Sequence, residues 1–543
     1  MILRRKREIH RSEHKNFPQR LLANYLSPHH FERKPIRYTA ILGLIAFLYG
    51  STFAFTNGYF LLQMTAPLVL LAGGAIWLLP ESEKAPSDHV AILLFIFLGV
   101  LLLWPDYLAV ALPDLPWITA VRLVGVPLAF VMLVTLSTSS EVRTQIAETL
   151  ASSKLIARLM LAFALIVSVS VAVSSSISVS IDKLIVASIN WFLVFYVSVY
   201  VFRKPGRLFA VVYALWIITI ILTLIGLQEW RHSGVPWAGH IPSFLAVQDE
   251  SVQRILSGSS RSATGIYRVQ SKFTTSLGFA EFYAYFIPFM LHFMVFGQRW
   301  VIRAGALLMI PVIFEMIVLT DSRLGMVGFF TSCLVYLLVW AIWRWQRDRD
   351  SAFGPLVALA YPAILAAFIA ATFLVGRLHA LIWGTGAQQA STDSRKLQIA
   401  MGIPKVLHQP WGYGIGRSAD ALQFYNGAGI LTIDTYYLSA ALEFGIFGFL
   451  VYYAIFIAGI VNAARHLRRA VSPEEMLIAP LMISMMNFFI IKSILSQIEN
   501  HALIFAMLGA SIAICWRIDV NWKDRAVAGT VLPIRRCGQQ QVP

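Results

Sequence analysis

Residues 438–464 read LSAALEFGIFGFLVYYAIFIAGIVNAA and contain a single charged residue, Glu443. A helix needs about 20 mostly apolar residues to cross the hydrocarbon core of a membrane, so this stretch is long enough for one crossing. The whole chain has the same character, because 58% of its 543 residues are hydrophobic and only 13% are charged. Soluble domains contain about 25% charged residues, which excludes a water-soluble protein. We therefore predict an all-α polytopic integral membrane protein.

Similar apolar stretches recur along the sequence and predict about 14 transmembrane helices, with a range of about 12 to 14 because the third stretch is short. The predicted helices are Tyr38–Phe55, Leu61–Leu79, Val90–Trp104, Ile118–Leu136, Leu155–Val173, Leu184–Phe202, Leu208–Leu227, Gly278–Phe296, Arg303–Leu319, Leu324–Trp343, Leu356–Val375, Leu438–Ala464, Met476–Ile494 and His501–Trp516.

The distribution of positive charge predicts how these helices are oriented. Lys and Arg number 44 against 28 Asp and Glu, a net charge of +16. Cytoplasmic segments of membrane proteins collect Lys and Arg, and most of these residues fall in segments that share one side of the membrane. We therefore predict that both termini are cytoplasmic, as a basic arm over residues 1–37 and a tail over residues 517–543. The basic excess thus indicates topology and contact with anionic lipids, and no nucleic-acid partner is expected.

Two segments on the opposite, outer side are long, residues 228–277 and 376–437. They separate three blocks of helices, residues 38–227, 278–375 and 438–516. Both loops are basic although positive charge normally stays inside, which suggests an anionic ligand, and arginine forks suit phosphate. The alternative is that long loops cross the membrane regardless of their charge. Their basic residues are Arg231, Arg254, Arg261, Arg268, Lys272, Arg377, Arg395, Lys396, Lys405 and Arg417.

The first long loop ends in RVQSKFTTSLGFAEFYAYFIP, residues 268–288. Arg268 and Lys272 are followed by hydroxyl side chains directly before the eighth predicted span. Unpaired N–H groups and the helix dipole make such a helix N-terminus a ready anion site. The alternative for Lys272 is that its ammonium group extends to the membrane interface.

The second long loop contains SRKLQIAMGIPKVLHQPWGYGIG, residues 394–416. The apolar spacing from Arg395 to Leu407 predicts a loosely amphipathic helix on the membrane surface, broken by Pro404 and stopped by Pro410. The glycines that follow do not form a dinucleotide fingerprint, because no strand precedes them. They predict a tight turn at Gly414 and Gly416 that lets backbone approach a ligand.

Polar residues at the outer membrane edge complete the candidate site. Asp434 lies just before the twelfth predicted span and is a candidate general base, with an N-cap as its alternative role. Arg122 lies near the outer end of the fourth span and Arg323 in a tight outer connection, positions at which charge usually marks function. Glu443 is a supporting, structural candidate. The cluster of Lys492, Glu499 and His501 is either an ion pair or part of a cavity.

The order of these motifs resembles the O-antigen ligase and polymerase superfamily of bacterial surface polysaccharide assembly. Three stretches carry the resemblance: RVQSKFTTSLGFAEFYAYFIP from Arg268, DSRLGMVGFF from Asp321, and SRKLQIAMGIPKVLHQPWGYGIG followed by DTYYLSAALEFGIFGFLVYY from Asp434. It covers residues 268–453 in detail and the remainder by hydropathy only.

This resemblance implies a GT-C-like membrane glycosyltransferase of the bacterial inner membrane with its active site facing the periplasm. The implied donor is a glycan on undecaprenyl diphosphate. Arg268 and Arg395 are implied to hold the diphosphate with Arg323 in support, and Lys272 and Arg122 are assigned to the same donor site. Because arginines can stabilise a departing diphosphate, we expect no metal and no cofactor. Expected partners are membrane lipids and other assembly proteins, such as a flippase or a chain-length regulator.

One departure from the family pattern decides between two activities. Ligases that transfer O-antigen to lipid A-core carry His where this chain has Asp434, so we favour a polymerase and keep a ligase as the alternative. A polysaccharide flippase or transporter is the alternative of another class. Transporters typically keep outer loops short and show two related halves, whereas this chain has long basic outer loops and no evident halves.

Overall fold

The computed structural model describes residues 87–527 apart from 112–116, 261–264, 351, 375, 377–378, 380–388 and 428, together with isolated positions between residues 43 and 81. The chain divides into two compact units, residues 1–86 with 131–143 and residues 87–130 with 144–543. All candidate site residues belong to the second unit. The basic arm and nearly all of the first two predicted spans lie outside the described residues.

The described residues are mainly helical. The helices are α6 (Ser87–Leu103), α7 (Ala120–Thr138), α8 (Ser140–Ala151), α9 (Lys154–Ser170), α10 (Ile177–Ala187), the π-helix η1 (Ser188–Leu193), α11 (Val194–Val201), α12 (Arg207–His232), α13 (Glu250–Leu256), α14 (Ser276–Phe296), α15 (Trp300–Leu319), α16 (Arg323–Arg347), α17 (Phe353–Leu374), α19 (Gln389–His408), α20 (Ser418–Leu422), α21 (Tyr436–Leu467), the 3₁₀-helix η3 (Glu475–Leu477), α22 (Ile478–Lys492) and α23 (His501–Val527). Two short antiparallel hairpins pair β1 (Ala109–Val110) with β2 (Ile118–Thr119) and β3 (Ser259–Ser260) with β4 (Tyr267–Arg268).

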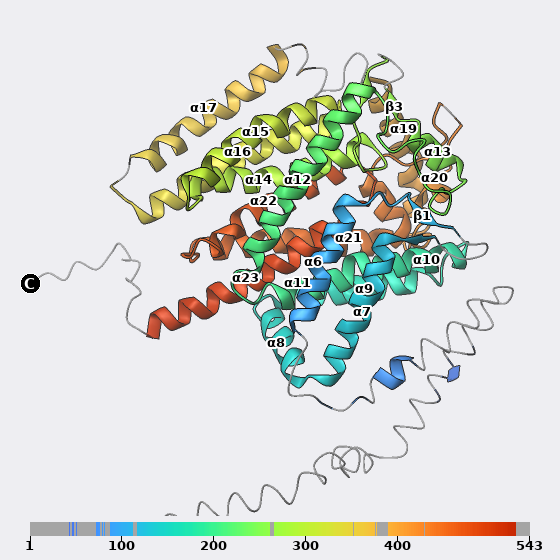
Figure 1. Cartoon of the computed structure of the whole chain (residues 1–543), viewed down its shortest axis with the longest axis horizontal. Helices are drawn as coiled ribbons and strands as arrows, with labels where there is room; N and C mark the ends of the chain where they lie inside the picture. The colour runs from blue at the N-terminus through green and yellow to red at the C-terminus, as the bar shows by residue number, and fades with distance from the viewer. Residues whose placement is uncertain are drawn as a thin grey trace, which may run out of the picture. The chain divides into compact units, whose positions relative to one another are not determined.

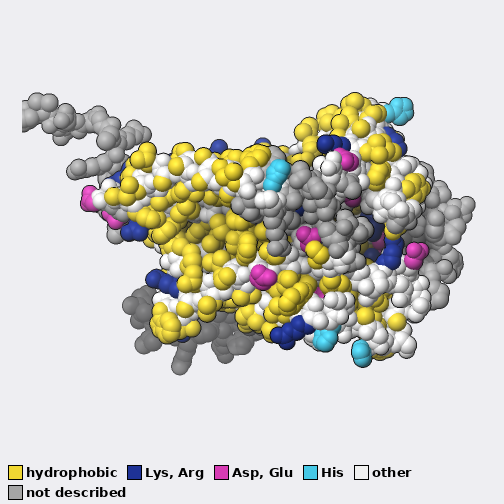
Figure 2. Space-filling view, turned by 90° about the horizontal axis from the view of Figure 1, so that it is seen from above, with side chains coloured by type: hydrophobic (Ala, Val, Ile, Leu, Met, Phe, Trp, Pro, Cys, Tyr) yellow, Lys and Arg dark blue, Asp and Glu magenta, His cyan; other side chains and the backbone are white. Residues whose placement is uncertain are grey.

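The helices confirm the predicted fold class. Each predicted span from Val90 onward coincides with a helix or a helical run in the structure. Among the described residues, 10 helices are long and apolar enough to cross a membrane. The α8–α9 pair passes the same test but bends by 109°, and α6 is a shorter apolar helix. Figure 2 shows hydrophobic side chains over much of the described surface, as lipid contact requires. The total of fourteen spans stays a prediction.

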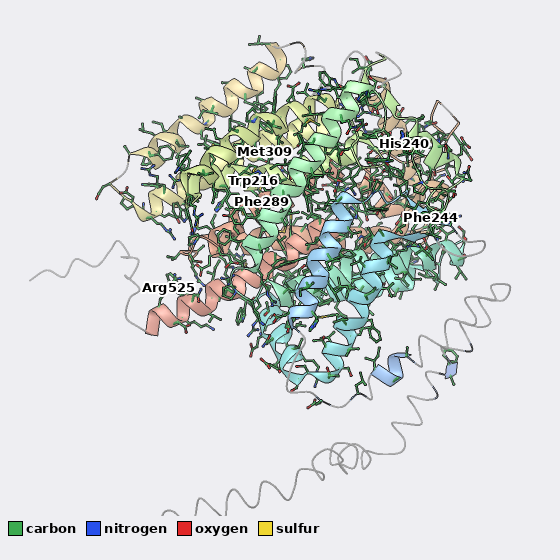
Figure 3. All side chains as sticks on the ribbon, viewed as in Figure 1. Trp216, His240, Phe244, Phe289, Met309 and Arg525 are labelled. Carbon is green, nitrogen blue, oxygen red and sulfur yellow. The ribbon has the colours of Figure 1, made fainter. Side chains whose placement is uncertain are left out.

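The most buried helices are α14, α22 and α23. Small residues let the neighbouring helix α16 approach α14, because a Cβ added at Gly328 would lie only 2.6 Å from the Cβ of Ala284. Close backbone approach of this kind drives packing between helices in membranes. The side chain of Asn487 on α22 then donates to the Ala284 carbonyl over 2.6 Å. In Figure 3, Trp216, Phe289 and Met309 lie among α12, α14 and α15.

An ion pair lies inside this core. The Lys492 Nζ of α22 is 2.7 Å from the Glu281 Oε1 of α14, and both side chains are fully buried. Glu281 also accepts hydrogen bonds from the Tyr285 hydroxyl over 2.6 Å and from the Asn500 amide over 2.9 Å. Lys492 is therefore part of an ion pair whose acidic partner the sequence did not indicate. A buried pair with its remaining hydrogen bonds satisfied is compatible with a membrane interior.

The connecting segments gather at one end of the second unit. Figure 1 shows β1, β3, α13, α19 and α20 together at the right-hand end of the long helices. His240 and Phe244 lie near this end, whereas Arg525 lies at the far end of α23 (Figure 3). The two long predicted loops thus contribute to the same end of the unit, and this is where the candidate site residues lie.

Candidate functional site

Arg268 is positioned by a loop that a buried carboxylate holds in place. Glu229, near the C-terminal end of α12, is fully buried. It accepts hydrogen bonds from the Tyr267 hydroxyl at 2.8 Å, the Gln270 N–H at 3.1 Å and the Ser271 N–H at 2.6 Å. These bonds fix the backbone on both sides of Arg268. The sequence did not suggest Glu229, because its partners, one hydroxyl and two backbone N–H groups, lie about 40 residues further along the chain.

We expect Glu229→Ala to destabilise the protein. The substitution leaves buried N–H groups without an acceptor, at a cost of about 1 to 3 kcal/mol for each such group. Thermal unfolding of the purified protein in detergent should show a lower midpoint. Glu250→Ala is the matched control, since the Glu250 side chain on α13 is 88% exposed. Equal midpoints for the two variants would contradict this role of Glu229.

The connection between α15 and α16 brings Arg268 next to Arg323. The Arg268 Nε donates to the Thr320 carbonyl over 3.0 Å, and the Val269 N–H donates to the Leu319 carbonyl over 3.2 Å. Three residues after Thr320, Arg323 begins α16, and the Ser322 hydroxyl caps that helix by accepting from the Gly325 N–H. The predicted tight connection is therefore present, and it places two of the three candidate arginines together.

Helix α19 brings the third arginine to this place. The Arg323 guanidinium donates to the Thr392 hydroxyl over 3.2 Å. Thr392 and Arg395 are three residues apart on α19 and therefore share a face of that helix. The Arg395 Nε is buried and has no hydrogen-bond partner among the described residues. Arg268, Arg323 and Arg395 thus come from three separate segments and are linked through the connection between α15 and α16.

Asp434 lies beside this arginine group. Its carboxylate accepts from the Gln398 amide over 3.1 Å, and its backbone N–H donates to the Gln398 Oε1 over 2.8 Å. Burial raises the pKa of Asp434 above its usual range, while the charge of Arg395 and the hydrogen bond from Gln398 act in the opposite direction. Burial also lowers the pKa of Arg395, which the charge of Asp434 opposes. The Asp434 carboxylate and the Arg395 guanidinium are thus close enough to influence each other's pKa. The ion pairs of the described residues do not include a direct one between them.

Gln398 is a site residue that sequence reasoning missed. It is fully buried. Its amide nitrogen donates to the Asp434 carboxylate, and its amide oxygen accepts from the Asp434 backbone N–H. The helical periodicity of α19 contained the signal, because Gln398 lies one turn after Arg395 and on the same face. Its partner is 36 residues away, which no local pattern reveals. Asp434 does not cap α21, because the Thr435 hydroxyl accepts the cap hydrogen bond from the Leu438 N–H.

Two of the predicted diphosphate ligands have other partners in the structure. Lys272 is buried, and its Nζ donates to the Leu101 carbonyl at the end of α6 over 2.7 Å. The Arg122 guanidinium forms an ion pair with Asp182 at 2.8 Å and donates to the Trp117 carbonyl. No hydrogen bond or ion pair that the structure describes joins either residue to the arginine group. Among the described residues, we therefore define the arginine group as Arg268, Arg323 and Arg395.

The predicted anion site at the start of α14 is filled by a carboxylate of the chain itself. Glu499 accepts hydrogen bonds from the backbone N–H and the hydroxyl of Thr274. The Thr275 hydroxyl caps α14 and also donates to the Gln497 side chain over 2.6 Å. The start of α14 does bind an anionic group, as its N–H groups and dipole predict. The predicted ligand position is filled by the Glu499 carboxylate of the chain itself.

The glycine turn packs against other segments of the chain. Gly414 donates to the Glu443 carbonyl over 3.1 Å, and α21 is kinked at Gly445, where φ is 70°. A Cβ at Gly414 would lie 2.6 Å from that of Ser174, and Gly416 packs against the Lys183 side chain. Both glycines have positive φ, so the turn requires them for conformation and for space. A role of Gly414 and Gly416 in approaching a ligand stays a prediction.

Glu443 supports the same turn. Its carboxylate accepts from the Ser418 hydroxyl over 2.8 Å, and Ser418 begins α20 directly after the glycine turn. The Ser439 hydroxyl donates to Ser418 over 2.7 Å and lies 3.4 Å from Glu443. Glu443 thus ties the turn to α21 next to the kink.

Helix α19 is longer than predicted. It runs from Gln389 to His408 and continues through Pro404 instead of breaking there. A proline inside a helix removes one hydrogen bond. The helix ends two residues before Pro410, as predicted. Among the described residues, no group of three or more His, Cys, Asp or Glu side chains is placed to hold a metal ion.

A comparison with protein families matches residues 304–453 to the family model described as O-antigen ligase. The matched region contains Arg323, Arg395, Gln398 and Asp434, whereas Arg268 lies before it. No curated protein matches the chain in a sequence comparison.

Proposed function

We propose that this chain acts as a member of the O-antigen ligase and polymerase superfamily, because residues 304–453 match the O-antigen ligase family model. The protein is a membrane glycosyltransferase that transfers or polymerises oligosaccharide repeat units from undecaprenyl-diphosphate-linked donors. One observation supports this proposal. The arginine group lies at the same end of the helices as the Asp434 carboxylate, which accepts a hydrogen bond from Gln398. The arginine group binds the diphosphate, and Asp434 acts on the acceptor.

The arginine group suits a diphosphate leaving group. During transfer, the bond between the anomeric carbon and the diphosphate oxygen breaks, and its electron pair stays on the diphosphate. Guanidinium groups that are already in place stabilise this charge without reorganisation. The Nε of Arg395 provides a donor that has no hydrogen-bond partner among the described residues. Arg268 donates to the Thr320 carbonyl, and Arg323 donates to the Thr392 hydroxyl, one turn before Arg395 on α19. These contacts hold two further positive charges at the site.

Asp434 suits the role of general base. The acceptor hydroxyl oxygen attacks the anomeric carbon while its proton passes to the Asp434 carboxylate, which returns it to water. A base of this kind contributes about 100-fold to 10,000-fold to the rate. Its raised pKa brings the carboxylate closer to the working pH and strengthens it as a base. The nearby charge of Arg395 lowers the pKa of Asp434 and so favours its ionised form, in opposition to burial.

We favour a polymerase and retain a ligase as the second candidate. In the family, ligases that use lipid A-core carry His where this chain has Asp434, which supports polymerase activity. The family description, O-antigen ligase, supports the second candidate. In both cases we propose that the protein lies in the bacterial inner membrane with both termini in the cytoplasm and the site facing the periplasm. A flippase and a chain-length regulator are the proposed partners of a polymerase.

The proposal is tested with purified protein in proteoliposomes. The substrate is a short glycan on a polyprenyl diphosphate, and the products are separated by chain length. We expect longer glycans and free polyprenyl diphosphate in proportion to the bonds formed. No consumption of the donor, with or without an added acceptor lipid, would overturn the proposal. Growth of carrier-linked glycan identifies a polymerase, and product only with the acceptor lipid identifies a ligase.

Gln398→Leu should change the pH dependence of this reaction. Asp434 must be ionised to accept a proton, so activity falls as the pH drops through its pKa. The Gln398 hydrogen bond lowers that pKa, and its loss should raise it further. The acid limb of the rate profile should therefore move to higher pH. Gln253→Leu, at an exposed position of α13, is the control. An unchanged acid limb in Gln398→Leu would contradict the assigned role of Gln398.

A further inference from the structure

Helix α19 exposes large apolar side chains, although Met401 and Val406 of the same helix pack against the buried cluster of Leu422, Leu438 and Leu442. Its inward face carries Gln398, which is buried, and Lys405, whose Nζ donates to the carbonyls of Ala421 and Leu422 over 2.8 Å. Its outward face carries a line of large apolar residues. Ile399 is 42% exposed, Ile403 is 52% exposed and Leu407 is 66% exposed. A helix facing water carries mainly polar and charged residues on its outward face.

The outward residues form one stripe. Ile399, Ile403 and Leu407 are four residues apart and therefore lie one above the other on the helix surface. Trp411, 69% exposed, follows just beyond the helix end. These four residues, called the α19 stripe, leave a contiguous apolar surface on a helix that also carries Arg395. Exposed patches of this kind mark contact with a partner or a membrane.

The α19 stripe continues onto the lipid-facing side of α21. The ring of Trp411 stacks on Phe447, with centroids 6.1 Å apart and an angle of 22° between the planes. Phe447 is 61% exposed and Leu450 is 56% exposed, and both belong to a helix that is long and apolar enough to cross the membrane. Side chains exposed on such a helix face hydrocarbon. The stripe is therefore continuous with the exposed apolar surface of a candidate membrane-spanning helix.

The kink in α21 fixes the depth of this junction. Beyond Gly445 the helix continues to Leu467, a length of about 33 Å at 1.5 Å per residue. This segment alone crosses a hydrocarbon core of about 30 Å. Phe447 therefore lies at the end of the crossing segment that is nearest to α19. A tryptophan packed there has the position that indole rings prefer, at the boundary between hydrocarbon and headgroups.

We propose that the α19 stripe is embedded in the adjacent membrane leaflet, with bilayer lipid as its partner. In the proposed orientation this is the periplasmic leaflet. Lys396 is exposed on the same side and reaches the lipid phosphates. The stripe thereby holds α19 at the depth of the headgroups, with Arg395 one turn before Ile399 and Gln398 on the inward face. This inference rests on the membrane fold and the contacts of α19, and it does not require the proposed glycosyl transfer.

Spin labels on single cysteines test this inference in the full-length protein. The native Cys333, Cys515 and Cys537 are replaced by Ala, and one cysteine is introduced by Ile403→Cys or Leu407→Cys. The labelled protein is placed in vesicles of phosphatidylethanolamine and phosphatidylglycerol. Accessibility to oxygen, which concentrates in hydrocarbon, is compared with accessibility to a water-soluble nickel chelate. Leu450→Cys supplies the value for lipid, and Glu250→Cys supplies the value for water.

We expect the labels at residues 403 and 407 to show high oxygen and low nickel accessibility, closer to residue 450 than to residue 250. Accessibility like that of residue 250 would overturn the proposal. Protection from both reagents would also overturn it, because it means that protein, such as a second copy of the chain, covers the stripe. If either variant does not fold, Ile399→Cys on the same stripe takes its place. Loss of glycosyl transfer does not alter this readout.

Discussion

Replacing Arg395 by Lys is expected to reduce glycosyl transfer by about 100-fold or more, as is typical when one fixed donor to a developing charge is removed. Lysine keeps the positive charge but replaces a planar fork with a single ammonium group, so paired contacts to phosphate oxygens are lost. The effect should be largest on the rate at saturating donor, because the charge on the diphosphate develops in the transition state.

Arg417→Lys is the matched control for Arg395→Lys. Arg417 lies in the same predicted loop, where it pairs with Asp420 at 2.9 Å and donates to the Ser175 hydroxyl over 3.1 Å. Partly exposed ion pairs contribute about 1 kcal/mol or less, so this variant should keep near-normal activity. Full activity of Arg395→Lys would remove Arg395 from the diphosphate site. Equal losses in both variants would indicate a general effect on the loop.

Replacing Asp434 by Asn is expected to reduce the rate by about 100-fold to 10,000-fold, the range for loss of a general base. Asparagine has nearly the same shape and can still accept a hydrogen bond from Gln398, so folding should be preserved. It has no basic site that could take the acceptor proton. The rate should then lose the acid limb that the wild type shows. Donor binding should change much less, since the arginine group is intact.

Asp420→Asn is the control for Asp434→Asn, because Asp420 is a carboxylate of the same loop that forms an ion pair with Arg417. Activity of this control should stay close to that of the wild type. Asp434→His is an informative second variant, because imidazole is also a base and His occupies this place in related ligases. Wild-type rates in Asp434→Asn would contradict the assignment of Asp434 as the base.

The membrane helices could be predicted from the sequence because a crossing segment needs only enough consecutive apolar residues. Each predicted span in the described part of the chain coincides with a helix. The bend between α8 and α9 and the kink of α21 at Gly445 were not predicted. The kink of α21 accompanies contacts with a distant segment, because the glycine turn forms backbone hydrogen bonds to the residues around Gly445.

The site could be predicted only in part. Charged residues at a membrane edge are costly and usually functional, which singles out Arg268, Arg323, Arg395 and Asp434. Gln398 carries no charge and lies in a polar stretch, so only its contact with Asp434 identifies it. A pattern of donors before a helix also cannot show whether a ligand or an internal carboxylate fills the site.

The most direct test of the proposed activity is the glycan profile of a deletion strain, both on the cell surface and on the lipid carrier. The strain is complemented with the wild type or with Asp434→Ala. We predict that long polymer is lost, that single repeat units remain on the carrier or core, and that only the wild type restores the polymer. Complete long chains accumulating on the carrier would indicate the ligase instead. An unchanged profile in the deletion strain would contradict a role in glycosyl transfer.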